Sequence, residues 1–520
     1  ARSFGVVALL TLVASFLGYV RDAAMAARFG ASIVTDAYFA AFFVPNTLSL
    51  ILLSNSVAIV FLPIFVEAFQ RDKRHAWKIA SSLFNLTFLL FSAVVLLSSV
   101  TAKFWMPILY SGFPDPTMQL AITLTQILMP MLIFIGLSTI VTAVLNSFDH
   151  FSVPAFAPVL GNILVIGAIF LSYYWWEIEG VAVVVTLSTL VQLLIQLPVL
   201  RKFDSHFSLS LQLKDPMIIR IFRLAIPLII YFAIAYASQA VEKNIASSLV
   251  VGTVSAVSYA ANLFRVPIAI FAGSLGTVIY PRLSLEAASE SPGQFSYSMS
   301  RAIGATTMFL LPLSCWLLIN SETLVNALFG FGRFSAADVH LTSIILAGYA
   351  LGMTANGVTR ILQRAFYAIQ DTATPVLVEV VSFAIYTALV ILLVRMIGTV
   401  GLGIARSVYF LVVALMSFWL LKRHREVAFG GSDYWLMFGR YFLASAGASA
   451  VWLGLGWLHG HYLVLPGRMA ELVYLGVSAV VGAVVFLVAA YLLKANEVLI
   501  LIGQIRSLEK KRKPQHYPDT

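Results

Sequence analysis

Charge and cysteine are both scarce in this 520-residue sequence. Only 11% of the residues are charged, 60% are hydrophobic, and the mean hydropathy is +0.93. These values exclude an ordinary water-soluble domain and indicate a polytopic membrane protein. The lone cysteine, Cys315, excludes an intrachain disulfide framework and a thiolate cluster for zinc or iron–sulfur.

Clusters of catalytic groups are also missing. The eight histidines are dispersed, and no HExxH or DxD-like pattern occurs. Acid–base or metal chemistry at a membrane face needs convergent acids, histidines or a metal site. The sequence therefore favours a protein that is not an enzyme, and an integral-membrane enzyme acting on a carrier lipid is kept as an alternative.

Long apolar runs are what the sequence does contain. A helix needs about 20 residues to cross a bilayer core. Fourteen runs of sufficient length lie near residues 3–28, 34–66, 78–103, 118–146, 153–174, 179–200, 217–247, 252–280, 298–319, 337–363, 374–394, 399–421, 434–458 and 469–494. The predicted fold is therefore all-α, with about 14 transmembrane helices.

The excess of positive charge lies in alternate connections. The formal net charge is +10. With the N-terminus placed inside, basic residues gather in cytoplasmic connections such as 71–78 and 201–223. The opposite loops hold only Lys103, Arg333, Arg395 and Arg468. Because cytoplasmic loops of membrane proteins are enriched in Lys and Arg, we expect both termini to be cytoplasmic and no nucleic-acid partner.

Two stretches about 220 residues apart resemble each other. Residues 36–69 read DAYFAAFFVPNTLSLILLSNSVAIVFLPIFVEAF, and residues 258–287 read SYAANLFRVPIAIFAGSLGTVIYPRLSLEA. Each has an aromatic and alanine-rich start, then VP, then a second proline before an acidic residue. The connections NSFDHFSVPAFAP (146–158) and RAFYAIQDTATP (364–375) are separated by a similar distance. Parallel duplication is a common transporter layout, with the substrate site between the halves.

The repeat predicts two six-helix lobes followed by two additional helices. The boundaries are 1–200 for the N-lobe, 215–421 for the C-lobe, 434–494 for the two C-terminal helices and 495–520 for a basic cytoplasmic tail. A division into seven plus seven helices conflicts with the basic connection at 201–223, which the charge pattern places inside.

Six motifs, in order along both halves, carry a resemblance to a known family. They are LGYVRDAAMAARFG (17–30), TDAYFAAFFVPN (35–46), FLPIF (61–65), FSVPAFAPVLGN (151–162), LGTVIYPRLS (275–284) and RAFYAIQDTATP (364–375). In these motifs the chain resembles the MurJ/MviN family of lipid II flippases, within the multidrug/oligosaccharidyl-lipid/polysaccharide exporter superfamily.

The resemblance implies that the chain moves an undecaprenyl-diphosphate-linked sugar across the bacterial cytoplasmic membrane by alternating access. A charge at the bilayer centre costs at least ~2.5–3.5 kcal/mol, and arginine offsets such a cost by pairing phosphate oxygens. By this resemblance Arg21 lines a central cavity and Asp36 lies beside it, to orient Arg21 or to respond to protonation. The residues alone leave a second interpretation, in which Arg21 pairs with Asp22 or extends toward a helix end.

Departures from the family pattern bear on the substrate. The family carries further arginines near positions that are Ser15, Ser49 and Asn262 here. Serine and asparagine hydrogen-bond sugar hydroxyls but hold a diphosphate less firmly than arginine. Two substrate classes therefore stay open, lipid II and another lipid-linked sugar such as an exopolysaccharide repeat unit.

Two cations are candidate replacements for the missing arginines. Arg265 lies one helical turn after Asn262 and shares its face, and Lys243 lies in the seventh predicted helix. We predict that Arg21 and Arg265 hold diphosphate, with Lys243 at the cavity or near a helix end. Ser15, Ser49 and Asn262 are predicted to contact the sugar or the carrier head group.

No cofactor is expected, and the coupling source is open between Na⁺, H⁺ and the membrane potential. By the resemblance, Glu379 is a weak candidate for binding a metal ion, with Ser382 or Asn356 nearby. The alternative interpretation of Glu379 is an acid near a helix N-terminus, which the helix dipole favours. Membrane lipids are the other expected partners, and the chain is expected to act as a monomer. A cation-coupled multidrug exporter of the same superfamily is the alternative transporter.

Overall fold

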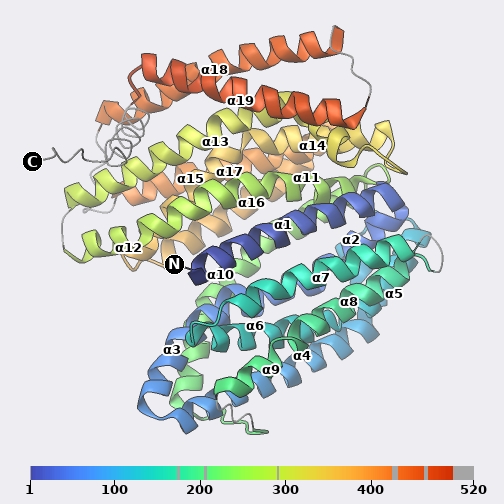
Figure 1. Ribbon diagram of the computed structural model, residues 1–520, viewed down its shortest axis with the longest axis vertical. Coiled ribbons are helices and arrows are strands. Elements are labelled where there is room, and N and C mark those ends of the chain that lie inside the picture. The colour runs from blue at the N-terminus through green and yellow to red at the C-terminus, as the bar shows by residue number, and fades with distance from the viewer. Residues whose placement is uncertain are drawn as a thin grey trace, which may run out of the picture. The chain divides into compact units, whose positions relative to one another are not determined.

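The computed structural model describes residues 2–172, 176–203, 208–289, 292–423, 431–461 and 467–495, and these residues contain helices and no strands (Figure 1). The elements are α1 (Arg2–Phe29), α2 (Ile33–Ser49), η1 (Leu50–Val57), α3 (Ala58–Arg71), α4 (Lys73–Leu109), α5 (Asp115–Leu128), α6 (Met131–Ser147), α7 (Ser152–Leu171), α8 (Ile178–Leu194), α9 (Leu197–Leu200), η2 (Arg201–Phe203), α10 (Pro216–Ser247), α11 (Thr253–Ile268), η3 (Ala269–Gly273), α12 (Ser274–Ala288), α13 (Pro292–Phe329), α14 (Ala336–Leu351), α15 (Met353–Ala368), α16 (Ala373–Ile397), α17 (Val400–Arg423), α18 (Gly431–His461) and α19 (Arg468–Leu492). Most of the predicted basic tail lies outside the described residues.

The predicted all-α membrane fold is confirmed. Within the described ranges, thirteen helices are long and apolar enough to cross a membrane, and α14 with α15 make a fourteenth span if the bent pair is counted as one. This pair corresponds to the predicted span at 337–363 and bends by 47°. The bend lies at Gly352, where a Cβ atom would come within 2.6 Å of Ser407 Cα on α17. Close packing of α17 therefore favours glycine at this break.

The chain forms two compact units. The first contains residues 1–259 and 329–341, and the second contains residues 260–328 and 342–520. The seventh long helix, α10, belongs to the first unit by its contacts. The predicted partition into lobes of 1–200 and 215–421 concerns the repeat, and it stays a prediction.

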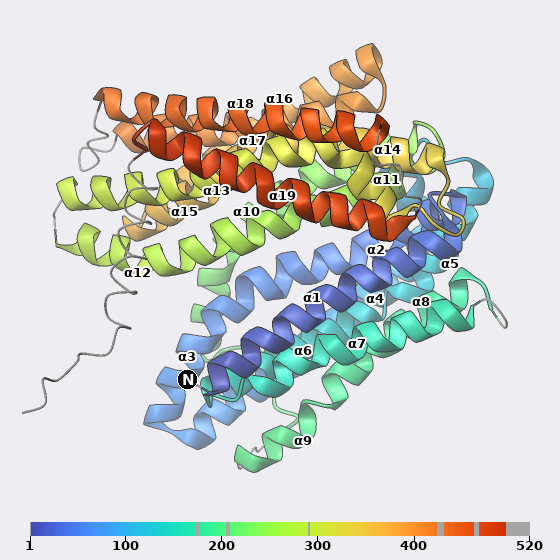
Figure 2. The same cartoon turned by 45° about the horizontal axis from the view of Figure 1, so that its top comes forward.

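In the first unit, α1 packs along α7, and both Figure 1 and Figure 2 show the two helices side by side. The core beneath α3, α4 and α6 is rich in aromatic side chains. Phe65 meets Trp77 edge to face at 5.8 Å, and Phe148 stacks on Trp77 at 6.2 Å. Each aromatic pair adds about 0.5–1.5 kcal/mol to the gain from burial.

The second unit packs α16 against α17, and α18 against α19. An aromatic cluster joins α18 and α19, where Tyr441 and Trp452 lie near Phe486. The Trp452 indole N–H donates to the backbone oxygen of Ser478 at 2.8 Å. This bond joins the two additional helices that the sequence predicted.

The backbone supports the predicted repeat at several matched positions. In each copy a helix containing the VP proline, Pro45 or Pro267, leads into a π-helical segment, η1 or η3. Proline lacks the N–H that continues an α-helix, and π-bulges are frequent where the regular ladder is interrupted.

The connections of the two copies also match. Asp149 and Gln370 lie about 220 residues apart, and both have a positive φ, of 56° and 60°. The following residues close the same six-to-one bond, from the His150 N–H to the Leu145 oxygen and from the Asp371 N–H to the Phe366 oxygen. Both helices therefore end in a Schellman motif.

Candidate functional site

Arg21 lies within the long apolar helix α1 and has a carboxylate partner. Its Nε and Nη2 atoms donate to Asp22 Oδ1 at 3.1 and 2.9 Å. The Arg21 side chain remains 34% exposed, whereas that of Asp22 is 9% exposed. The pairing that the residues alone suggested is therefore present, and it leaves part of the guanidinium accessible.

Asn162 of α7 is the second partner of Arg21. Its side-chain oxygen accepts from Arg21 Nη1 at 3.3 Å, and its amide donates to the backbone oxygen of Ala14 at 3.0 Å. Asn162 thereby links the guanidinium to the backbone of the same helix. Sequence reasoning missed this residue, although it ends the quoted motif FSVPAFAPVLGN.

Asp36 is buried, and its partners are two backbone N–H groups and one hydroxyl at the start of α11. It is 4% exposed. Oδ2 accepts from the Gly252 N–H at 2.7 Å, while Oδ1 accepts from the N–H and the hydroxyl of Ser255 at 2.7 and 2.8 Å. Asp36 thus caps the first turn of α11, where the helix dipole favours a negative charge. The hypothesis that Asp36 orients Arg21 is not supported by this geometry, because Asp22 occupies that position.

Lys243 is buried between α2 and α11. Its Nζ donates to Ser258 Oγ at 2.7 Å and lies 5.4 Å from the centroid of the Phe43 ring. Lys243 is 9% exposed and its neighbour Glu242 is 4% exposed. The structure therefore places Lys243 in an interior contact between helices of the first unit.

The two predicted serines differ in accessibility. Ser15 lies on the exposed face of α1, and its hydroxyl donates to the Thr11 backbone oxygen at 2.9 Å. Ser49 is 1% exposed and donates to the Asn46 backbone oxygen at 2.7 Å. Ser49 would reach a ligand only if the helix next to η1 rearranged.

Asn262 and Arg265 follow each other by one turn on α11 and belong to the second compact unit. Asn262 is partly exposed and Arg265 is exposed. Within the described part of the chain, no hydrogen bond or ion pair engages the Arg265 guanidinium. Arg265 is therefore available to an anion, and its predicted role stays a prediction.

Arg28 has a structural partner near the end of α7. Its Nη2 donates to the backbone oxygen of Ser172 at 3.0 Å, and its Nε donates to the Ser172 hydroxyl at 3.3 Å. Ser172 is the C-cap residue of α7. A cation at a helix C-terminus is stabilising, which accounts for this arginine without a ligand.

Glu379 on α16 is 3% exposed and accepts a hydrogen bond from the Tyr409 hydroxyl on α17. The positive charge of Arg406, also on α17, acts on the same carboxylate. The two residues named as possible co-ligands have other partners, since the Ser382 hydroxyl faces Met416 Sδ and the Asn356 oxygen accepts from Arg360. Among the residues the structure describes, no group of three or more His, Cys, Asp or Glu side chains is placed to hold a metal ion.

Comparisons with known proteins agree with this fold. The family model described as lipid II flippase MurJ matches residues 25–497. The lipid II flippase MurJ of Burkholderia cenocepacia is 29% identical over 463 residues, covering 87% of this chain and 89% of that protein. The probable lipid II flippase MurJ of Rickettsia prowazekii is 25% identical over 499 residues, covering 95% of this chain and 97% of that protein.

Two solved structures share the fold. A lipid II flippase MurJ in an inward closed conformation matches with a TM-score of 0.78 and 23% identity, covering 94% of this chain and 98% of that chain. An inward-facing multidrug resistance transporter of the MATE family matches with a TM-score of 0.68 and 16% identity, covering 80% of this chain and 94% of that chain.

Proposed function

This chain belongs to the lipid II flippase MurJ family, whose model matches residues 25–497, and we propose that it carries an undecaprenyl-diphosphate-linked oligosaccharide across the membrane by alternating access. The curated relatives reported above are lipid II flippases or probable ones, so lipid II is the first candidate substrate. Among the residues, the observation that carries the proposal is the partly exposed Arg21 within the long, mainly apolar helix α1.

The contacts of Arg21 suggest how it serves a diphosphate. Asp22 balances the guanidinium charge, so that the helix does not carry an uncompensated cation through the membrane. A diphosphate would bond to the guanidinium N–H groups that Asp22 and Asn162 leave unused, because guanidinium forms strong, bidentate bonds with phosphate oxygens. Asn162 would hold the Nη1 side of the fork in place.

Arg265 is the proposed second contact for the substrate. It is exposed, and Asn262 one turn earlier is partly exposed on the same face. Arg265 would add positive charge, and Asn262 would bond a sugar hydroxyl or a phosphate oxygen. Asp36 and Lys243 would support the helices around the site rather than touch the substrate, because both are buried in contacts between helices.

Serines and an asparagine stand at positions where the family carries arginines, and this favours a second candidate substrate. Ser15, Ser49 and Asn262 lower the positive charge that is available to a diphosphate. A transporter for a different lipid-linked sugar, such as an exopolysaccharide repeat unit, would keep the fold and change these contacts.

We propose the cytoplasmic membrane of a bacterium as the location, with both termini inside, and a monomer as the working form.

Complementation tests the proposed function. Cells depleted of their own lipid II flippase would express the wild type, Arg21→Ala or Arg28→Lys. We expect the wild type and Arg28→Lys to restore growth, because Arg28 serves the end of α7 and its charge is kept. Arg21→Ala should fail at equal membrane abundance. Rescue by Arg21→Ala would contradict the role of Arg21.

A reconstituted assay separates the substrates. Purified protein in vesicles would be given fluorescent lipid II or a fluorescent lipid-linked exopolysaccharide repeat unit, and the fraction moved across the bilayer would be measured. Movement of lipid II supports lipid II as the substrate. Movement of the second lipid alone supports a transporter for an exopolysaccharide repeat unit. Release of phosphate or transfer of sugar would indicate an enzyme instead, and export of cationic dyes would indicate a multidrug exporter.

A further inference from the structure

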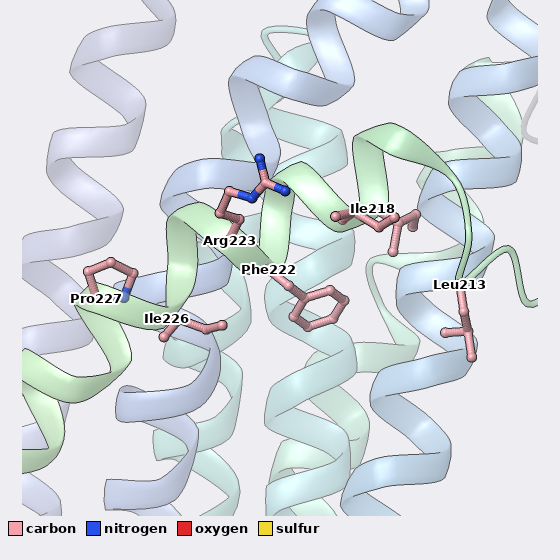
Figure 3. Close-up of a pocket in the computed structure, with 7 residues that line it drawn as sticks. Leu213, Ile218, Phe222, Arg223, Ile226 and Pro227 are labelled. Carbon is pink, nitrogen blue, oxygen red and sulfur yellow. The ribbon is translucent and has the colours of Figure 1, made fainter.

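An apolar pocket lies at the start of α10, inside the first compact unit. Its volume is about 520 Å³, within the range of about 300–1,000 Å³ that is typical of ligand pockets. Figure 3 shows Arg223 as the one charged side chain that lines it, and the other lining residues are Leu213, Ile218, Ile219, Phe222, Ile226 and Pro227. The chemistry of this wall suits a hydrocarbon chain with a negative group at one end.

The wall that contains Leu213 is held in place by α4. The Asn85 amide donates to the backbone oxygens of Ser208 and Ser210 at 2.8 and 3.1 Å. The backbone N–H groups of Ser208 and Gln212 donate to hydroxyls of α4 at 3.1 and 3.0 Å. These bonds fasten the segment 208–212 to a long helix and fix the backbone that leads into Leu213.

The cation of the pocket is available for binding. Arg223 is exposed, and among the described residues no hydrogen bond or ion pair engages its guanidinium. One turn earlier, Arg220 differs, because its Nη1 donates to Glu67 Oε2 at 2.9 Å. Pro227 also has no N–H to offer the Arg223 carbonyl, which leaves that oxygen without its helical donor.

The pocket lies where a lipid head group would meet the helix. α10 has 32 residues, so at 1.5 Å per residue it is about 48 Å long and exceeds the ~30 Å hydrocarbon core. Arg223 lies about two turns from its first residue, close to the expected boundary of the core. Exposed apolar side chains flank the arginine, with Leu213 55%, Ile219 45% and Ile226 53% exposed.

Other basic residues surround this end of α10. Arg71 is the last residue of α3, and Lys73 is the first residue of α4. Both are close in sequence to Glu67, which pairs with Arg220 of α10. Lys214 precedes α10 and is exposed. Basic pockets between helices at the positively charged membrane face recruit anionic lipid head groups.

We propose that this pocket binds one anionic glycerophospholipid, with an acyl chain against Ile219, Phe222 and Ile226 and with the head-group phosphate on Arg223. The lipid would be a bound neighbour of the transporter and not its cargo. The proposal therefore does not depend on which lipid-linked sugar the protein moves.

Titration of the delipidated full-length protein tests the site. Native mass spectrometry would measure the dissociation constants of phosphatidylglycerol and phosphatidylcholine for the wild type, Arg223→Gln and Arg220→Gln. We expect Arg223→Gln to weaken phosphatidylglycerol binding about fivefold to tenfold, the loss of one cation–phosphate contact. Phosphatidylcholine binding should weaken less, because the choline cation of that lipid already offsets the charge of its phosphate. Arg220→Gln should change phosphatidylglycerol binding less than twofold, because its guanidinium already pairs with Glu67.

A second pair of variants tests the apolar half of the pocket. Ile226→Trp would fill the pocket, whereas Ile230→Trp adds the same bulk one turn further along α10, outside it. Both positions are about half exposed, so both variants are expected to fold, and thermal melting would verify this. Only Ile226→Trp should lower phosphatidylglycerol binding.

Several outcomes would overturn the proposal. Equal binding by the wild type and Arg223→Gln would remove Arg223 from the site. An equal loss in Arg220→Gln would indicate attraction by general surface charge. Displacement of phosphatidylglycerol by millimolar inorganic phosphate would mean that the pocket holds a free anion. Displacement by equimolar undecaprenyl phosphate would mean that the pocket belongs to the carrier lipid.

Discussion

The Asp36 carboxylate of α2 accepts the Ser255 backbone N–H of α11 at 2.7 Å, joining two segments about 220 residues apart in sequence. The same carboxylate accepts the Ser255 hydroxyl and the Gly252 N–H. Asp36 and Ser255 are 4% and 0% exposed. An acid predicted to serve the substrate therefore holds together the helices beside the proposed site.

Replacing Asp36 should mainly reduce stability. Asp36→Ala would leave the buried N–H groups of Gly252 and Ser255 without an acceptor, whereas the Ser255 hydroxyl keeps the Gly252 oxygen. Each unsatisfied group costs about 1–3 kcal/mol. We expect a lower thermal midpoint for Asp36→Ala, and a smaller decrease for Asp36→Asn because one oxygen acceptor remains. Thermal unfolding of the purified protein in detergent measures both. Ser15→Ala is the control, since that hydroxyl is exposed, and a wild-type midpoint in Asp36→Ala would contradict the capping role.

Asn162 is expected to position Arg21 for transport. Asn162→Leu removes the acceptor of Arg21 Nη1, and losing a hydrogen bond to a charged group costs about 1.5–3 kcal/mol. We therefore expect transport by Asn162→Leu to fall about tenfold or more at equal membrane abundance, together with a modest decrease in the melting midpoint. Asn162→Asp keeps an acceptor and should retain more transport. Equal transport by Asn162→Leu and the wild type would show that Arg21 needs no support from α7.

The sequence predicted the spans well because each span is a local property. Runs of apolar residues identify a membrane helix without knowledge of its neighbours. The π-helical segments that follow Pro45 and Pro267 were not predicted, although both prolines belong to the repeat. The partners of polar residues were not predictable in this way. Hydropathy does not say which face of a helix meets another helix, so Asn162 was missed.

Burial was the other limit of sequence reasoning. Ser49 was selected because the family that the chain resembles carries an arginine near that position, and Lys243 because it is a cation that could replace a missing arginine. In the structure both are almost fully buried, and each has a hydrogen-bond partner within the protein. Interhelical hydrogen bonds are the common alternative role for such residues, and only the contacts distinguish the two roles.

Gly252 is expected to tolerate no side chain. Its φ is +93°, and a Cβ would lie 2.5 Å from the Ala31 backbone oxygen. Gly252→Ala therefore combines a strained backbone with a steric clash and disturbs the bond to Asp36, so we expect a clear decrease in the melting midpoint. Gly167→Ala is the matched control, because no atom lies within 4 Å of its Cβ and alanine favours a helix. A similar decrease in both variants would contradict this account.

The buried pair of Glu379 and Arg406 gives a prediction about charge. The two side chains are 3% and 4% exposed, and the Arg406 guanidinium lies 4.4 Å from the Tyr386 ring centroid and 5.4 Å from that of Tyr409. The Arg406 charge acts on the Glu379 carboxylate, so removing either side chain leaves the other charge buried with less compensation and lowers stability. We expect Glu379→Gln and Arg406→Met each to lower the melting midpoint. The double variant should melt closer to the wild type than either single variant.

The same pair predicts the response to sodium. Because Arg406 supplies a positive charge beside Glu379, the wild type should melt at the same temperature in sodium chloride and in choline chloride. In Arg406→Met the carboxylate lacks that charge, and sodium should raise the midpoint. Stabilisation of the wild type by sodium that disappears in Glu379→Gln would show instead that Glu379 binds the ion. In that case the Arg406 charge would not take the place of a sodium ion at Glu379. Sodium would then be the first coupling ion to test in a transport assay.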